Sequence, residues 1–140
     1  MRALVLYGSD RRLEAVAQGV AAGLEAAGLE VDRKRMDQVG AGPITTAQYQ
    51  LVAVGSTSRG FLGGKVPAEV AETVPRCSRL QGKQTVAFIV PGPFGSTKTL
   101  RALMALLEKE GAWVQDFAAL KSSAEAREFG SRLRNLLETR

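Results

Sequence analysis

Short apolar runs alternate with amphipathic stretches along this chain, and that alternation restricts its fold more than any other feature. Three runs rich in Val, Leu and Ile have the length of strands buried on both faces: Ala3–Tyr7, Leu51–Val54 and Thr85–Val90. Leu29–Met36 alternates apolar with basic side chains, which is typical of a strand at the edge of a sheet. Ala112–Phe117 is a fifth candidate strand, and we expect its Trp113 in the core.

The stretches between these runs carry apolar residues at helical spacing. The first has Val16 on its apolar stripe and the third has Leu103, so we expect both side chains to be buried against the sheet. Residues that favour helix starts precede four stretches, namely Asp10, Pro67, Ser96 or Thr97, and Ser122. Residues 38–48 are ambiguous between a short helix and a loop.

The resulting order of strands and helices predicts an α/β fold. Strands that alternate with helices form parallel sheets with right-handed crossovers, and the helices cover both faces. Because Ala3–Tyr7 is apolar throughout and Leu29–Met36 is not, we expect the first strand in the centre and the second at the edge, in the order 2-1-3-4-5. No linker, repeat or low-complexity stretch interrupts the sequence, so we expect residues 1–140 to form one domain.

The composition argues against several kinds of chemistry. The chain has no histidine and one cysteine, Cys77, so it lacks the commonest general base, an internal disulfide and the usual zinc ligands. We therefore expect no metal site and no catalytic acid–base residue, and any redox chemistry must come from a cofactor. No apolar run reaches the roughly 18 residues of a membrane span, and the N-terminal run is too short for a signal peptide, which favours a cytoplasmic protein.

The charge balance favours an anionic partner. The 19 Lys and Arg residues exceed the 14 Asp and Glu residues, which gives a net charge of +5. Such a surplus suits a phosphate-bearing ligand or an acidic protein. Apart from Arg33–Arg35 the cations are spread along the chain, and few aromatic residues are present to stack on bases. These two features disfavour nucleic acid as the partner.

Three loops should emerge together at one edge of the sheet. In an open parallel sheet, ligands bind beyond the carboxyl ends of the strands, where the strand order reverses. The loops after the first, third and fourth strands are residues 8–12, 55–65 and 91–97, and all three are rich in Gly, Ser or Thr. The third loop also approaches a P-loop, but Thr97 replaces the glycine that directly precedes the lysine in that motif, which argues against nucleotide hydrolysis.

These loops and their flanking elements resemble flavodoxins over nearly the whole chain. The likeness rests on Val5–Ser9 with Glu14–Ala17, on Val54–Thr57 with Pro67–Val70, and on Phe88–Gly95 with the helix and strand that follow. It implies a flavodoxin-like three-layer sandwich and one non-covalently bound FMN that carries electrons between partner proteins. It also implies an FMN site made of Ser9, Asp10, Arg11, Arg12, Leu13, Ser56, Thr57, Ser58, Phe61, Gly92, Phe94 and Gly95, with Phe61 and Phe94 flanking the flavin ring.

The phosphate loop departs from the family pattern. Flavodoxins typically carry Ser-Thr-Thr-Gly-Asn-Thr here, whereas Ser9 is followed by Asp10-Arg11-Arg12-Leu13, which is one residue shorter and lacks Gly and Thr. Asp10 would repel a phosphate, while Arg11 and Arg12 would either bind it or remain solvated. Two functions therefore stay open: an FMN-binding electron-transfer protein that meets an acidic redox partner, and a flavodoxin-fold module that has lost FMN and acts as a binding or regulatory subunit.

Overall fold

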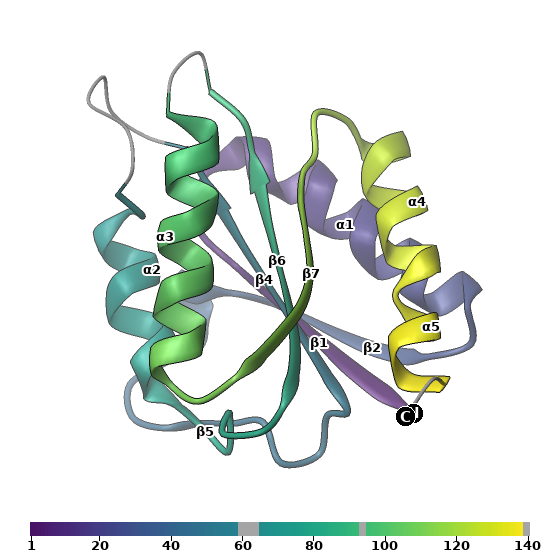
Figure 1. Cartoon of the computed structure of the whole chain (residues 1–140), viewed down its shortest axis with the longest axis horizontal. Helices are drawn as coiled ribbons and strands as arrows, with labels where there is room; N and C mark the ends of the chain where they lie inside the picture. The colour runs from purple at the N-terminus through teal and green to yellow at the C-terminus, as the bar shows by residue number, and fades with distance from the viewer. Residues whose placement is uncertain (59–64, 93–94, 139–140) are drawn as a thin grey trace.

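Five parallel strands form the central sheet of the computed structural model, which describes residues 1–58, 65–92 and 95–138. The strands are β1 (Arg2–Tyr7), β2 (Glu30–Arg35), β4 (Leu51–Thr57), β6 (Gln84–Val90) and β7 (Trp113–Ala119). They lie in the order β2-β1-β4-β6-β7, and neighbouring strands pair in parallel (Figure 1). Counted along the chain these are the first to fifth strands of the sheet, so the expected order 2-1-3-4-5 is confirmed.

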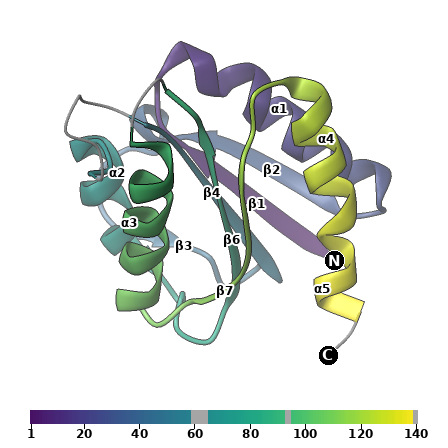
Figure 2. The same ribbon diagram turned by 45° about the horizontal axis from the view of Figure 1, so that its top comes forward.

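Helices cover both faces of this sheet and complete the three layers of the predicted sandwich (Figures 1 and 2). α1 (Arg11–Ala26), α4 (Ser123–Arg132) and α5 (Arg134–Glu138) lie on one face, and α2 (Ala68–Thr73) and α3 (Ser96–Lys109) lie on the other. Because successive strand residues point to opposite faces, β1 divides its side chains between two cores. Ala3 and Val5 pack with α1, whereas Leu4 and Leu6 pack with α2 and α3.

Glycines allow α1 and α4 to approach each other closely. A Cβ atom on Gly23 would collide with the backbone carbonyl of Arg127, and a Cβ atom on Gly130 would collide with the carbonyl of Val20. The two helices can therefore pack at this distance only because neither contact residue has a side chain. The contact fixes α1 on the sheet and, with it, the loop that joins β1 to α1.

A second, two-stranded sheet lies outside the main one. β3 (Ile44–Thr45) pairs in parallel with β5 (Cys77–Ser78), and short 3₁₀ turns over Met36–Gln38 and Val74–Arg76 precede the two strands. The ambiguous residues 38–48 thus contribute a very short strand. Two residues carry no periodicity, so the sequence could not reveal this pairing.

The expectation that Trp113 lies in the core is wrong, because its side chain is 49% exposed. β7 ends the sheet and has a neighbouring strand on one side only. Its seven residues alternate between exposed and partly buried, so helices cover this strand incompletely. The pairing also skips Gln115 between Val114 and Asp116, and Phe117 beyond it is 52% exposed.

Val16 and Leu103 are buried as expected, with 3% and 0% of their surface exposed. Leu103→Ala should therefore lower the free energy of unfolding by about 2–5 kcal/mol, because it leaves a cavity against the sheet. Urea denaturation followed by circular dichroism measures this loss. Leu106→Ala, on the same helix at a partly exposed position, is the matched control and should cost clearly less. Equal losses in the two variants would contradict the burial of Leu103.

Candidate functional site

The carboxyl ends of β1, β4 and β6 lie at one edge of the sheet, the upper edge in Figure 1, where α1 also begins. From β1 the chain passes outward to β2 and then returns to β4 on the other side of β1. The strand order reverses at this point, which is where open parallel sheets bind ligands. The structure thus brings the first and second predicted loops together at the expected place.

A pocket of about 240 Å³ opens at this switch point, between the first turns of α1 and α2. It brings together five of the residues predicted for the FMN site, namely Ser9, Asp10, Leu13, Ser56 and Thr57, and adds one that sequence reasoning missed, Glu69. The side chains of Arg11 and Arg12 are exposed on α1, and neither residue lines the pocket.

The Glu69 carboxylate binds a backbone donor near the start of the first loop, the N–H of Ser9. Its Oε1 atom accepts a hydrogen bond from the Ser9 N–H at 2.7 Å. The same oxygen lies so close to Gly8 that a Cβ atom there would be 3.3 Å away. A backbone N–H at this position would be a donor to a phosphate placed in the loop, so the carboxylate stands where a phosphate oxygen would bind.

The carboxylate and the carbonyl of Asp10 accept hydrogen bonds from two further N–H groups of the loop. Its carboxylate accepts from the Arg12 N–H at 2.9 Å and so caps α1, as the sequence predicts. The Arg12 guanidinium lies 3.4 Å from the same carboxylate, and the Leu13 N–H donates to the Asp10 carbonyl at 3.0 Å. The N–H groups of Ser9, Arg12 and Leu13 are therefore all satisfied within the protein.

Ser56 and Thr57 belong to β4 rather than to a loop, because β4 pairs with β6 as far as Thr57 and Val90. Both residues are almost completely buried, and Ser58 beside them is 6% exposed. The Ser56 hydroxyl donates to the Thr57 carbonyl at 3.1 Å, and the Ser58 hydroxyl lies 3.4 Å from that of Thr99 on α3. These hydroxyls bind groups of the protein itself, and at the pocket the second loop is represented by the end of β4.

The third loop contributes two glycines with defined backbone roles. A Cβ atom on Gly92 would lie 3.2 Å from the Ser58 carbonyl, so the loop packs directly on the end of β4. Gly95 precedes α3 in the left-handed conformation (φ 75°) that glycine adopts without steric cost. The expectation that Ser96 or Thr97 caps α3 is therefore wrong. Phe61 and Phe94, which the resemblance places beside a flavin ring, lie outside the described residues.

A third carboxylate stands near the same edge. Glu14 on the first turns of α1 accepts a hydrogen bond from the Tyr7 hydroxyl at 3.1 Å. Burial and the neighbouring Glu14 raise the pKa of Tyr7 above its usual value. The end of β1 is thus surrounded by Asp10, Glu14 and Glu69.

The first loop in this arrangement does not fit the phosphate of FMN. A phosphate dianion in the pocket would meet the carboxylates of Asp10 and Glu69, and like charges at short range repel. It would also find three of the loop's N–H donors already bonded. Arg11 stays exposed, and Arg12 is paired with Asp10, so it offsets the charge of Asp10 but leaves that of Glu69. The binding of FMN at this edge stays a prediction.

Glu69 could have been noticed from the sequence, although its partner could not. It follows Pro67-Ala68 in the first turn of a predicted helix at the carboxyl edge, where the helix dipole favours a negative charge. Ser9 lies 60 positions away in the sequence, and only the packing of α2 beside β1 joins the two.

The described residues contain no group of three His, Cys, Asp or Glu side chains arranged to hold a metal ion. Over the same ranges, none of the helices combines the length and the apolar character that crossing a membrane requires.

The similarity of this chain to known proteins lies in its structure. No family model matches the sequence, and a search of curated proteins finds no significant relative. Among solved structures, a flavodoxin from the domain Archaea is 21% identical over 99% of both chains, with a TM-score of 0.78.

Two further flavodoxins superpose over nearly their whole length. The oxidised flavodoxin 1 of Bacillus cereus is 16% identical over 96% of this chain and 98% of its own, with a TM-score of 0.73. The two-electron reduced flavodoxin of Megasphaera elsdenii is 20% identical over 94% and 99%, with a TM-score of 0.69. The chain therefore has a flavodoxin-like fold.

Proposed function

We propose that this chain is a cytoplasmic binding module with a flavodoxin-like fold, which has no resident FMN and docks an acidic partner protein at its edge strand β2. The observation that carries the proposal is the hydrogen bond from the Ser9 N–H to the Glu69 carboxylate. An intramolecular carboxylate takes the position that a ligand phosphate would need, and it is tethered there by the fold.

The Glu69 carboxylate and the phosphate of FMN compete for one donor, the Ser9 N–H. A hydrogen bond to a charged group contributes about 1.5–3 kcal/mol. A phosphate can gain the Ser9 N–H only when Glu69 gives up that contribution, and it must also approach Asp10. The loss corresponds to roughly ten- to a hundredfold weaker binding of FMN than an open loop would allow.

The edge strand β2 supplies the cations for an acidic partner. A pocket of about 390 Å³ beside this strand is lined in part by Arg33, Lys34 and Arg35. Arg35 is held by Asp37 at 2.7 Å. Arg33 and Lys34 are exposed, and within the described part of the chain neither lies in an ion pair. Two unpaired cations next to a pocket are complementary to carboxylate side chains of another protein.

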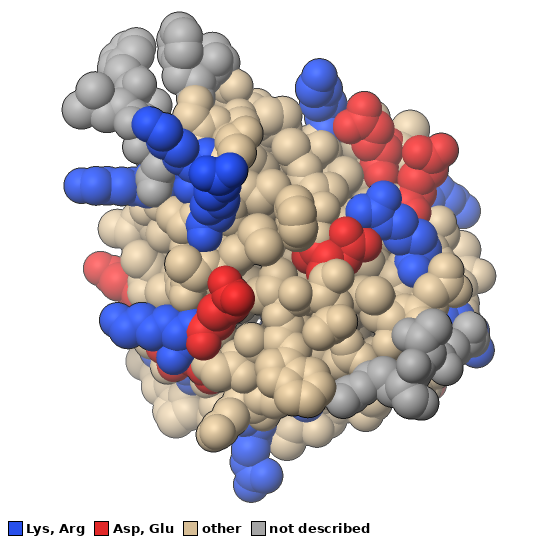
Figure 3. All heavy atoms as spheres, viewed as in Figure 1, with Lys and Arg blue, Asp and Glu red and all other residues tan. Residues whose placement is uncertain are grey.

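The rest of the surface supports a protein partner over nucleic acid. On the face shown in Figure 3, Lys and Arg side chains are interspersed with Asp and Glu side chains, and no continuous basic stripe crosses it. Nucleic-acid binding needs such a stripe to follow the phosphate backbone. The surplus of five positive charges is therefore better suited to local docking at β2.

A second candidate, an FMN-binding electron-transfer protein, is favoured by the similarity to flavodoxins that were solved in oxidised and reduced forms. For this candidate, Glu69 has to release the Ser9 N–H. The side chains of Arg11 and Arg12 also have to turn toward the phosphate. The remaining predicted contacts of the flavin ring, from Ser58, Phe61, Gly92, Phe94 and Gly95, belong to this candidate.

Quenching of flavin fluorescence distinguishes the two candidates. We expect the unmodified protein to bind FMN no better than riboflavin, since the phosphate gains no contact. Glu69→Ala should free the Ser9 N–H and tighten FMN by about ten- to a hundredfold, without changing riboflavin. Glu72→Ala, which removes an exposed carboxylate from the same helix, is the matched control and should leave both affinities unchanged. An unmodified protein that binds FMN far more tightly than riboflavin would favour the electron carrier.

Docking at β2 predicts a site-specific effect of charge. We expect the double variant Arg33→Gln, Lys34→Gln to bind a polyglutamate peptide about five- to tenfold more weakly, because each exposed ion pair contributes up to about 1 kcal/mol. Arg101→Gln, Lys109→Gln on α3 removes the same net charge from exposed positions and should have little effect. Isothermal titration calorimetry at low ionic strength measures both, and equal weakening would remove β2 as the docking surface.

A further inference from the structure

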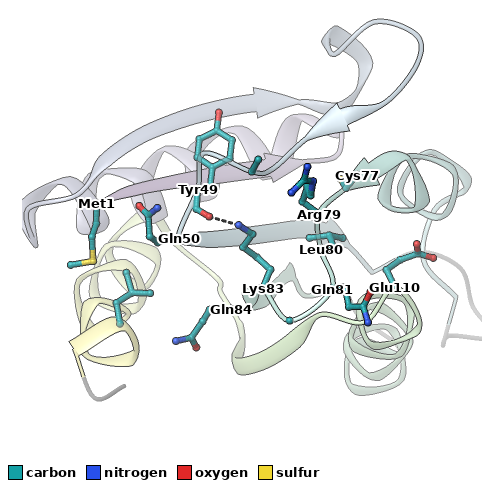
Figure 4. A pocket seen from close by; sticks show the side chains of 13 residues that line it. Met1, Tyr49, Gln50, Cys77, Arg79, Leu80, Gln81, Lys83, Gln84 and Glu110 are labelled. Atoms are coloured by element: carbon teal, nitrogen blue, oxygen red, sulfur yellow. Dashed lines mark hydrogen bonds between the residues drawn. The ribbon is translucent and has the colours of Figure 1, made fainter.

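A large cavity lies at the amino edge of the sheet, opposite the pocket that Ser9 and Glu69 line. It has a volume of about 870 Å³, which is sufficient for a small organic ligand. Three parts of the chain surround it: the turn before β4, the segment between β5 and β6, and the two chain ends at Met1 and Leu137 (Figure 4). No residue of the flavodoxin-like site contributes to it.

The frame of this cavity is held by hydrogen bonds that do not involve its charged side chains. The N–H and hydroxyl of Thr46 both donate to the Ser78 carbonyl, at 3.2 and 2.6 Å. The Gly82 N–H donates to the Gly111 carbonyl at 2.8 Å. The two turns that form the walls are therefore fixed before any ligand arrives, which lowers the entropic cost of binding.

Two cations of one segment line this cavity. The Lys83 ammonium donates to the Tyr49 carbonyl at 2.5 Å, and the exposed Arg79 side chain lies close enough for its charge to act on Lys83 (Figure 4). Burial and the positive charge of Arg79 lower the pKa of Lys83. Within the described residues neither cation forms an ion pair with a carboxylate. Like charges held together without an anion are unfavourable in the protein alone.

Arg79 also has an unusual backbone. Its φ of 68° is the one positive value at a non-glycine residue in the described part of the chain. Residues other than Gly, Asn and Asp reach the left-handed region at a cost, and such strain concentrates at ligand sites. Glycine would adopt this backbone conformation with less strain than arginine does.

The other side chains that line the cavity indicate which groups a ligand would carry besides its anionic group. Met1 and Leu137 provide apolar surface at the cavity, whereas Leu80 is buried in the core behind it. Glu110 is also part of the lining but lies beyond Gln81, on the far side from Met1 (Figure 4). Met1 therefore lies at one end of the cavity and Glu110 at the other, with Lys83 between them (Figure 4).

We propose that this cavity binds a small organic anion, with its carboxylate, sulfonate or phosphate group at Arg79 and Lys83 and its apolar body toward Met1 and Leu137. The anion supplies the negative charge that the protein does not provide there. Because the cavity lies at the opposite edge from Glu69 and shares no lining residue with the pocket at Arg33–Arg35, this site is independent of the function proposed above.

Saturable binding of 8-anilinonaphthalene-1-sulfonate to the folded protein tests the site, with uncharged N-phenyl-1-naphthylamine as the comparison probe. Arg79→Gly should weaken the sulfonate about tenfold or more and change the neutral probe little, since one charge-assisted contact is lost. The same variant should raise the melting temperature by roughly 2–4 °C, because glycine relieves the strained backbone. Arg79→Lys keeps the charge and should bind the sulfonate within about twofold of the original protein.

Two further variants test the polarity of the cavity. Lys83→Gln should also weaken the sulfonate, and Glu110→Gln should tighten it about two- to fivefold. The proposal is overturned if the original protein shows no saturable sulfonate binding, or if Arg79→Gly binds it unchanged. It is also overturned if Arg79→Gly weakens the charged and neutral probes equally, because the arginine would then only shape the wall.

Discussion

Parallel pairing of β1, β4 and β6 is the constraint from which the rest of this structure follows. All but one of the residues of these three strands are buried, so both faces of the sheet centre must be covered. Parallel neighbours cannot be joined by hairpins, and the helices that join them supply this cover. The same crossovers gather the carboxyl ends of the strands at one edge and the amino ends at the other. The two sites discussed above lie at these two edges.

The sequence was sufficient for the parts of the fold that depend on local periodicity. Runs such as Ala3–Tyr7 are apolar enough to be central strands, and the basic alternation of Leu29–Met36 marks the edge, as the structure confirms. The sequence was insufficient where strand pairing, rather than local periodicity, decides the structure. Ser56 and Thr57 look like loop residues, yet pairing with β6 continues β4 through them. Trp113 looks like a core residue, yet the last strand has one neighbour and a skipped pair.

The same limit explains the candidate site. Sequence reasoning brought Ser9, Asp10 and Leu13 to the correct pocket, because a helix start after the first strand is a local feature. It identified the loss of threonine hydroxyls but not their replacement. That replacement is Glu69, which reaches Ser9 only because α2 packs across the end of β1. Contacts between residues so distant in the chain leave no periodic signal in one sequence.

The two edges differ in how their polar groups are satisfied. At the carboxyl edge, carboxylates of the protein accept hydrogen bonds from two N–H groups of the first loop, those of Ser9 and Arg12. At the amino edge, Arg79 and Lys83 stand together without a carboxylate partner in the described residues, and a site for an anion is left open.

The most direct test of this view is the amide resonance of Ser9 in heteronuclear NMR spectra while FMN is titrated into the unmodified protein. The hydrogen bond to Glu69 predicts that this resonance stays in place at FMN concentrations that leave the protein folded. A saturable shift of the Ser9 amide, together with those of Arg11 to Leu13, would show that phosphate displaces the carboxylate. It would contradict the self-satisfied loop and make the FMN-binding electron carrier the better description of this chain.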